Sequence, residues 1–98
     1  INVISDVQQR YWNLVRAIED SRVSRESLRR AEKLLESNKI QVEAGTMAPI
    51  EVLEAESGVA SQLENVINAE NEILDKEDEL KEILDMVVGQ SLIEAINS

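Results

Sequence analysis

The sequence predicts an all-α fold, a long antiparallel hairpin of two coiled-coil helices. Three observations predict it. The composition, with 31% charged and 2% aromatic residues, is typical of long helices and not of a β-sandwich or an α/β domain. Apolar residues recur at heptad spacing on both sides of the midpoint. One break, over residues 45–48, separates the two periodic stretches, and 98 residues suffice for a single small domain.

The first helix is expected over about residues 3–44. Its apolar residues step by three and four along one face, and the stripe resumes after a polar interval at Ser21 and Arg25. The stripe consists of Ile4, Val7, Tyr11, Leu14, Ile18, Leu28, Leu35 and Val42, with the small residues Ala17, Ser24 and Ala31 beside it. Such a near-heptad repeat predicts an amphipathic coiled-coil helix.

The break has the composition of a tight turn between two helices. Gly45 lies where a left-handed residue would end the first helix. Pro49 suits the first turn of a new helix, where its missing N–H has no helical partner to lose. Glu51 and Glu54 follow near the positive end of the second helix dipole. Residues 45–48 are therefore expected to form the turn.

The second helix is expected over about residues 49–88, with Gly89 ending it and residues 89–98 forming a short tail. One heptad row runs without a miss through Val52, Val59, Val66, Ile73, Leu80 and Val87. A second row follows one residue later at Leu53, Ala60, Ile67 and Leu74. Two adjacent rows make a stripe wider than a two-stranded seam needs, which indicates that this helix touches more than one neighbour.

Folding the chain at the turn predicts the pairing of the two helices. Val42 is expected to meet Leu53, and Leu28 to meet Ile67. Leu35 is likewise expected to meet Ala60, and Val7 to meet Val87 or Val88. The same register brings a set of basic residues (Arg22, Arg25, Arg29 and Arg30) near a set of acidic ones (Glu64, Glu70 and Glu72). A single hairpin leaves most of the apolar face of its second helix in water, so we expect it to pack against copies of itself or against other helices.

Composition also excludes several classes of function. The chain has no His and no Cys, which removes the commonest general base, the commonest metal ligand and thiol chemistry, so we expect no catalytic site, metal or cofactor. The net charge is −10, and residues 50–98 carry 2 Lys/Arg against 13 Asp/Glu, so a nucleic acid is not an expected partner. The chain begins in mid-pattern without Met, and we expect it to be a piece of a longer protein.

Two stretches, "YWNLV" and "LLESNKIQVEAGTMAPIEVLEAE", carry a family resemblance. They resemble the periplasmic helical hairpin of the TolC-like outer membrane efflux proteins. The sharpest element is Gly45 followed by Glu51, Val52 and Leu53. The resemblance extends over about residues 3–88 and fits the first of the family's two internal repeats better than the second.

The resemblance implies a specific architecture and partner. Proteins of this family are trimers whose hairpins assemble into a hollow α-helical barrel across the periplasm. The tips meet a periplasmic adaptor, which connects the duct to an inner-membrane pump in tripartite efflux or type I secretion. The docking tip would consist of Gly45, Thr46, Met47, Ala48, Pro49, Ile50, Val52 and Leu53, and Glu51 and Glu54 would form an acidic pore constriction. The isolated hairpin could instead form a dimer or a four-helix bundle.

Other interpretations of the same residues stay open at this point. Gly45 and Pro49 can be plain helix punctuation, and Glu51 and Glu54 can simply compensate the helix dipole. A periplasmic adaptor also contains a long hairpin, but its tip carries Arg, Leu and Ser, whereas the nearest Arg before this turn is Arg30. A generic coiled-coil interaction module without a transport role is the third alternative.

Overall fold

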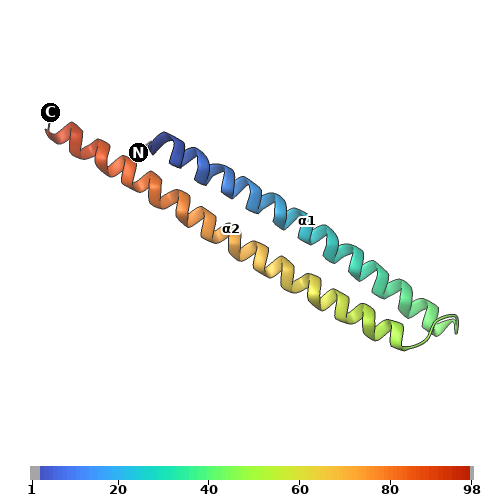
Figure 1. The fold of residues 1–98 in the computed structure, drawn as a ribbon. Coiled ribbons are helices and arrows are strands. Elements are labelled where there is room, and N and C mark those ends of the chain that lie inside the picture. Colours follow the sequence, from blue (N-terminus) through green and yellow to red (C-terminus); the bar gives the residue numbers. More distant parts are fainter. Residues whose placement is uncertain (1–2, 98) are drawn as a thin grey trace.

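The computed structural model describes residues 3–97, which form two long antiparallel helices (Figure 1). Helix α1 spans Val3–Glu43 and helix α2 spans Ile50–Asn97. The hairpin extends over 80 × 16 × 15 Å, and no strand occurs between residues 3 and 97. The predicted all-α, two-helix antiparallel hairpin is therefore confirmed.

The second helix is longer than predicted. Helix α2 continues through Gly89 to Asn97, so the prediction that Gly89 ends the helix and opens a tail was wrong for residues 89–97, while Ser98 lies outside the described residues. A glycine inside a helix costs only up to about 1 kcal/mol relative to Ala. Neither a proline nor a left-handed residue follows it in the described chain, so nothing stops the helix there. At the other end of the hairpin, the connection covers residues 44–49, slightly wider than the expected 45–48.

A seam of two heptad rows holds the helices together. On α2 every member of the Val52 row is buried or half-buried, as are the members of a matching row on α1: Val7, Leu14, Ser21, Leu28, Leu35 and Val42. The second row of α2, through Leu53, Ala60 and Ile67, is exposed. The prediction that these three residues pair with α1 was therefore wrong. Successive helical residues are rotated by about 100°, so the row that faces α1 turns the next row away from it.

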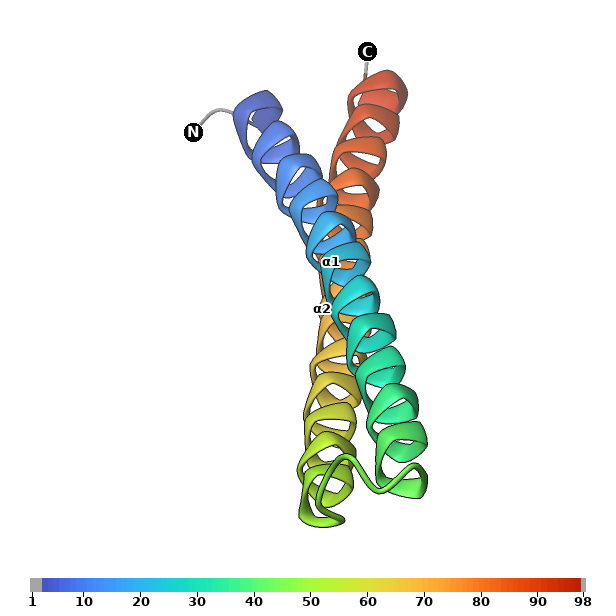
Figure 2. The same ribbon diagram turned by 90° about the vertical axis from the view of Figure 1, so that its right-hand side faces the viewer.

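The core between the helices is thin. Within residues 3–97 the buried hydrophobic side chains are Ala17, Ala55, Val66 and Ile83, whereas twenty large hydrophobic residues are exposed. In Figure 2 the two helices cross and then diverge toward the two termini. The least exposed side chains of α1 are those of Ala17 and Ser21, at 3% and 2%. The hairpin alone thus covers only a minor part of its apolar surface.

One of the predicted cross-helix ion pairs forms. Arg25 Nη2 lies 3.2 Å from Glu70 Oε1, which joins α1 to α2. The neighbouring arginines pair within α1 instead, Arg22 with Glu19 at 2.6 Å and Arg30 with Glu26 at 3.8 Å. The hydrogen bond from Arg22 lowers the pKa of Glu19 below its ordinary value. All these groups are largely exposed, so they guide the pairing of the helices more than they stabilise it.

Candidate functional site

The turn closes α1 with two backbone hydrogen bonds around a left-handed glycine. Gly45 has a φ of 80°, and its N–H donates to the carbonyl of Val42 at 3.0 Å. The N–H of Thr46 donates to the carbonyl of Gln41 at 3.0 Å, and its Oγ1 donates to the same oxygen at 3.1 Å. This is a complete Schellman motif, which satisfies carbonyls that the end of the helix leaves without partners. The left-handed C-cap predicted at Gly45 is confirmed.

Helix α2 starts directly after Pro49. The N–H of Glu51 donates to the carbonyl of Ala48 at 3.0 Å, and that of Val52 donates to the carbonyl of Pro49 at 3.1 Å. Pro49 has no N–H to offer, and its fixed φ suits this position. Glu51 lies in the first turn, where its negative charge is favourable beside the unpaired N–H groups of the helix end.

The predicted docking residues divide between the surface and the seam. Gly45, Thr46, Ala48, Pro49, Ile50 and Leu53 are exposed, with Ile50 at 53% and Leu53 at 60%. Met47 is half-buried, and Val52 faces α1 as part of the seam. The tip therefore presents an apolar surface centred on Ile50 and Leu53, and Val52 supports it from inside. The docking role of these residues stays a prediction.

Glu51 and Glu54 line one shallow hollow beside the tip. Its other lining residues are Ala31, Leu34, Asn38, Ala55 and Gly58. Asn38 is 7% exposed, and its Nδ2 donates to the backbone carbonyl of Glu51 at 3.3 Å. The two acidic side chains thus occupy the same side of the hairpin, as a shared constriction would need.

A set of exposed apolar residues, which we call the apolar side, follows the hairpin along one edge of its seam, with charged residues between them. It consists of Leu53, Leu63, Ile67, Leu74, Leu84 and Val88 on α2, and of Ile4, Tyr11, Val15 and Ile18 on α1. Arg25 continues the heptad row of Ile4 and Ile18, and Glu70 continues that of Leu63. Because Arg25 and Glu70 form an ion pair across the seam, these rows lie on the same side of the hairpin.

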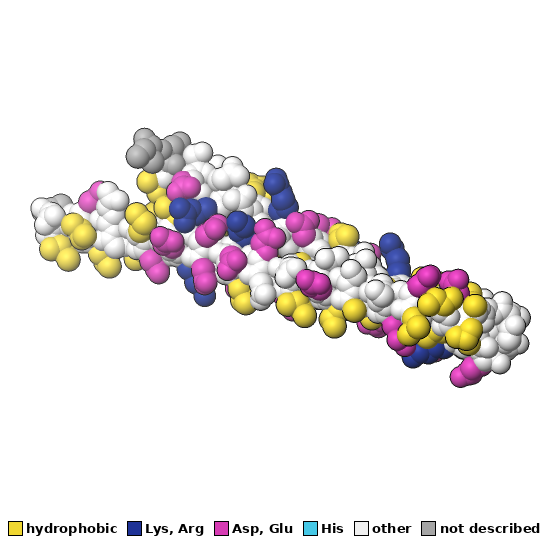
Figure 3. All heavy atoms as spheres, turned by 60° about the horizontal axis from the view of Figure 1, so that its bottom comes forward, with side chains coloured by type: hydrophobic (Ala, Val, Ile, Leu, Met, Phe, Trp, Pro, Cys, Tyr) yellow, Lys and Arg dark blue, Asp and Glu magenta, His cyan; other side chains and the backbone are white. Residues whose placement is uncertain are grey.

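The space-filling view shows how this apolar surface is distributed. Hydrophobic side chains gather at the tip and recur along the hairpin, with acidic side chains between and beside them (Figure 3). On α2, the rows flanking the opposite edge of the seam carry acidic and polar residues such as Glu51, Glu54, Glu72 and Asp75. On α2, exposed large apolar residues are therefore more frequent on the apolar side between residues 53 and 84, and acidic residues are frequent on the opposite edge.

The two aromatic residues lie at the end of the apolar side that is far from the tip. The rings of Tyr11 and Trp12 meet edge to face, with centroids 5.6 Å apart, and are 51% and 61% exposed. This geometry is typical of favourable aromatic pairs. Their exposure leaves both rings free to pack against another helix.

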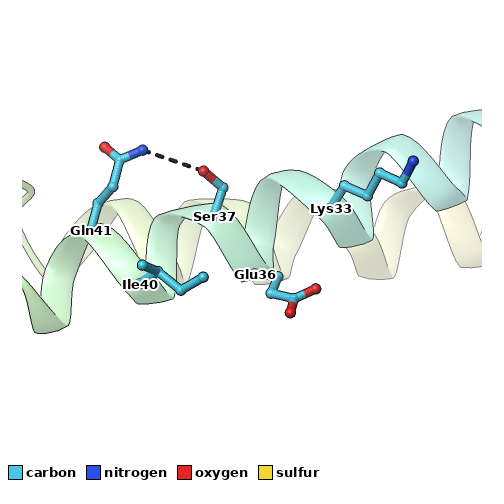
Figure 4. A pocket seen from close by; sticks show the side chains of 5 residues that line it. All are labelled: Lys33, Glu36, Ser37, Ile40 and Gln41. Atoms are coloured by element: carbon cyan, nitrogen blue, oxygen red, sulfur yellow. Dashed lines mark hydrogen bonds between the residues drawn. The ribbon is translucent and has the colours of Figure 1, made fainter.

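A hollow on the outward side of α1 lacks the features of a binding site. Lys33, Glu36, Ser37, Ile40 and Gln41 line it, and all five come from one helix (Figure 4). Gln41 Nε2 donates to Ser37 Oγ at 3.3 Å along the helix surface. Among the described residues, no cluster of acidic side chains could hold a metal ion. Within residues 3–97, no helical stretch has the sustained apolar character of a membrane span.

The sequence was also compared with models of known protein families. The sequence model of the family described as outer membrane efflux protein matches residues 1–85. The chain belongs to this family. The recognised TolC-like resemblance is thereby confirmed, and an outer membrane efflux protein is a transport protein and not a member of an enzyme family. No curated protein and no solved structure matches the chain.

The sequence interpretation missed one residue of the site. Asn38 is a buried polar residue on the inward side of α1, next to the tip. Its heptad spacing from Ala17, Ser24 and Ala31 already indicated an inward position. A polar residue at an inward position is the feature that could have identified it.

Proposed function

We propose that this chain forms part of the wall of the periplasmic duct of an outer membrane efflux protein, and that its tip docks a periplasmic adaptor. The parent would be a trimer serving a tripartite efflux or type I secretion system. It would act as a passive conduit, with the energy supplied by a pump in the inner membrane. The chain itself would carry no catalysis, because it has neither His nor Cys and no enclosed site in its described part.

The apolar side is the observation that carries this proposal. A helix in the wall of a barrel has two neighbours, one on each flank. The seam provides the first contact of α2, through the Val52 row. The apolar side provides the second, since Leu53, Ile67 and Leu74 are 60%, 50% and 58% exposed in the isolated hairpin. An exposed apolar stripe of this length normally marks a surface that a partner covers.

The tip supports the docking half of the proposal. The Schellman turn presents Ile50 and Leu53 at the far end of a hairpin 80 Å long. Gly45 has no side chain, and a Cβ placed there would have no heavy atom within 4 Å, so a partner backbone can approach closely. Met47 adds a flexible apolar side chain that can adapt to a partner surface.

Family membership favours this function over the alternatives. A periplasmic adaptor hairpin and a generic coiled-coil module would share the helical periodicity. Neither would be expected to match an outer membrane efflux protein model over residues 1–85.

Site-specific photo-crosslinking at Ile67 of the intact protein tests whether the apolar side packs against another helix in a barrel wall. Ile67 lies on the apolar side, and its neighbour Asn68, which is also exposed, points away from that side. We expect a crosslinker at position 67 to form adducts with another helix of the same protein, identified by mass spectrometry, and one at position 68 to form few. Equal adducts from both positions, or adducts from position 67 with unrelated proteins only, would contradict the proposal.

A further inference from the structure

In one row of α1 that faces α2, the size and polarity of the side chains change along the hairpin. It runs through Arg10, Ala17, Ser24, Ala31 and Asn38 at heptad spacing. In the middle the side chains are small, Ala17 is 3% exposed, and the two helices cross (Figure 2). At both ends the side chains are longer and polar. Small side chains allow the two helices to approach closely in the middle, and the longer side chains of Arg10 and Asn38 reach α2 at the two ends.

Both polar end residues donate hydrogen bonds to backbone carbonyls of α2. Arg10 Nη1 donates to the carbonyl of Glu79 at 2.7 Å, and Asn38 Nδ2 donates to that of Glu51 at 3.3 Å. Arg10 and Asn38 are four heptads apart on α1, and Glu51 and Glu79 are four heptads apart on α2. The two contacts are therefore equivalent in register. A helical carbonyl can accept a second donor because its oxygen has two lone pairs.

We propose that Arg10 and Asn38 are two braces that fix the axial position of α1 against α2, and that Asn38 is the positioning residue for the tip. Asn38 acts through Glu51, because it holds the first turn of α2 against α1. This inference concerns the hairpin itself and does not depend on the proposed transport function.

The burial of Asn38 supports a role in specificity. An apolar side chain of similar size at this 7% exposed position would give a more stable seam. A buried amide is favourable only in the register that provides its acceptor, since sliding α1 along α2 leaves it without a partner. Single polar residues in coiled-coil cores fix register in the same way, at a cost in stability.

Hydrogen exchange of the variant Asn38→Leu tests the brace at the tip. We expect the melting temperature to rise and the amides along the shaft to exchange more slowly. The amides of residues 54–56, including the one that bonds to the Glu51 carbonyl, should exchange about fivefold faster, the change that one modest hydrogen bond controls. If Asn38 contributed only to the overall stability, the exchange rates at the tip and along the shaft would change in the same direction.

Gln62→Leu is the matched control for this experiment. Gln62 is half-buried at an inward position of α2, and neither brace involves it. This variant should slow exchange along the shaft without speeding it at the tip. Slower exchange at the tip of Asn38→Leu, or an equal acceleration in both variants, would overturn the proposal.

A second variant tests the other brace independently. Arg10→Met keeps the aliphatic stem but removes the donor to Glu79, so exchange should accelerate near Ile83 and stay unchanged at the tip. Asp6→Asn is its control, because Arg10 also pairs with Asp6 at 3.5 Å and this change removes only that ion pair. If Arg10→Met and Asp6→Asn have the same effect, Arg10 is not a brace.

Discussion

Gly45 has a φ of 80°, and among the described residues it is the only one with a positive φ. Replacing it by Ala should lower the free energy of unfolding by about 1–2 kcal/mol, because an L side chain is strained in the left-handed region. Since no heavy atom lies within 4 Å of the added Cβ, this strain is the whole expected effect. Urea denaturation followed by far-UV circular dichroism measures it.

Gly58→Ala is the control for this prediction. Gly58 lies inside α2, and a Cβ there also meets nothing within 4 Å. Ala is the better helix former, so this change should raise the stability by up to about 1 kcal/mol. A similar loss of stability in both variants would show that Gly45 has no special role in the turn.

The two carboxylates beside the tip support a prediction about the intact protein. If Glu51 and Glu54 line the constriction, the double variant Glu51→Gln/Glu54→Gln should reduce the preference for cations, because rings of acidic side chains favour cations. If the two carboxylates also take part in closing the tip, the double variant should raise the conductance as well. Single-channel recording in planar bilayers measures both properties.

The exposed Glu64 on the shaft of α2 provides the control. Glu64→Gln removes a charge from the same helix without changing the tip. If the double variant conducts and selects ions as Glu64→Gln does, Glu51 and Glu54 only compensate the helix dipole.

At the scale of the helix, adjacent residues of α2 have different roles. Val66 is 7% exposed in the seam, whereas Ile67 is 50% exposed on the apolar side. In the isolated chain, Val66→Ala should cost about 2 kcal/mol, because it removes buried apolar groups worth about 0.8 kcal/mol each and leaves a gap. Ile67→Ala should cost well under half of that. Thermal unfolding of the two variants distinguishes them, and equal costs would mean that both rows are buried by self-association.

The sequence predicted both helices, the turn and the Val52 row, because heptad spacing and Gly45 are local features. It did not predict which of the two α2 rows faces α1. Leu53 and Ile67 are as apolar as Val52 and Val66, so hydrophobicity alone cannot choose between them. The choice depends on how α1 packs against α2, including at the small residues Ala17 and Ser21, which are 3% and 2% exposed.

The sequence analysis also did not predict where α2 ends or what the inward polar residues contact. The sequence predicts a helix end at Gly89, yet a glycine ends a helix where the backbone turns left-handed, and among the described glycines only Gly45 does so. The heptad spacing of Asn38 indicates an inward position but not its hydrogen-bond partner. Its acceptor is a backbone carbonyl, and a backbone acceptor leaves no pattern in the side-chain sequence.

At the scale of the whole molecule, the hairpin is a two-sided ribbon. Its seam buries few hydrophobic side chains, and its apolar side is uncovered along most of its length. Such a ribbon is a poor independent folder and a suitable element of a larger wall. The chain belongs to the outer membrane efflux protein family, which supports the proposed place of the hairpin in a duct wall and of its tip as the docking surface.

Photo-crosslinking from position 47 of the intact protein in living cells tests the central claim most directly. A crosslinking residue replaces Met47 in the turn, and mass spectrometry identifies the adducts. We expect a periplasmic adaptor protein among them, and none when the crosslinker replaces the exposed Ser61 on the shaft. A cytoplasmic partner, or adducts of the chain with itself only, would contradict the docking of the tip.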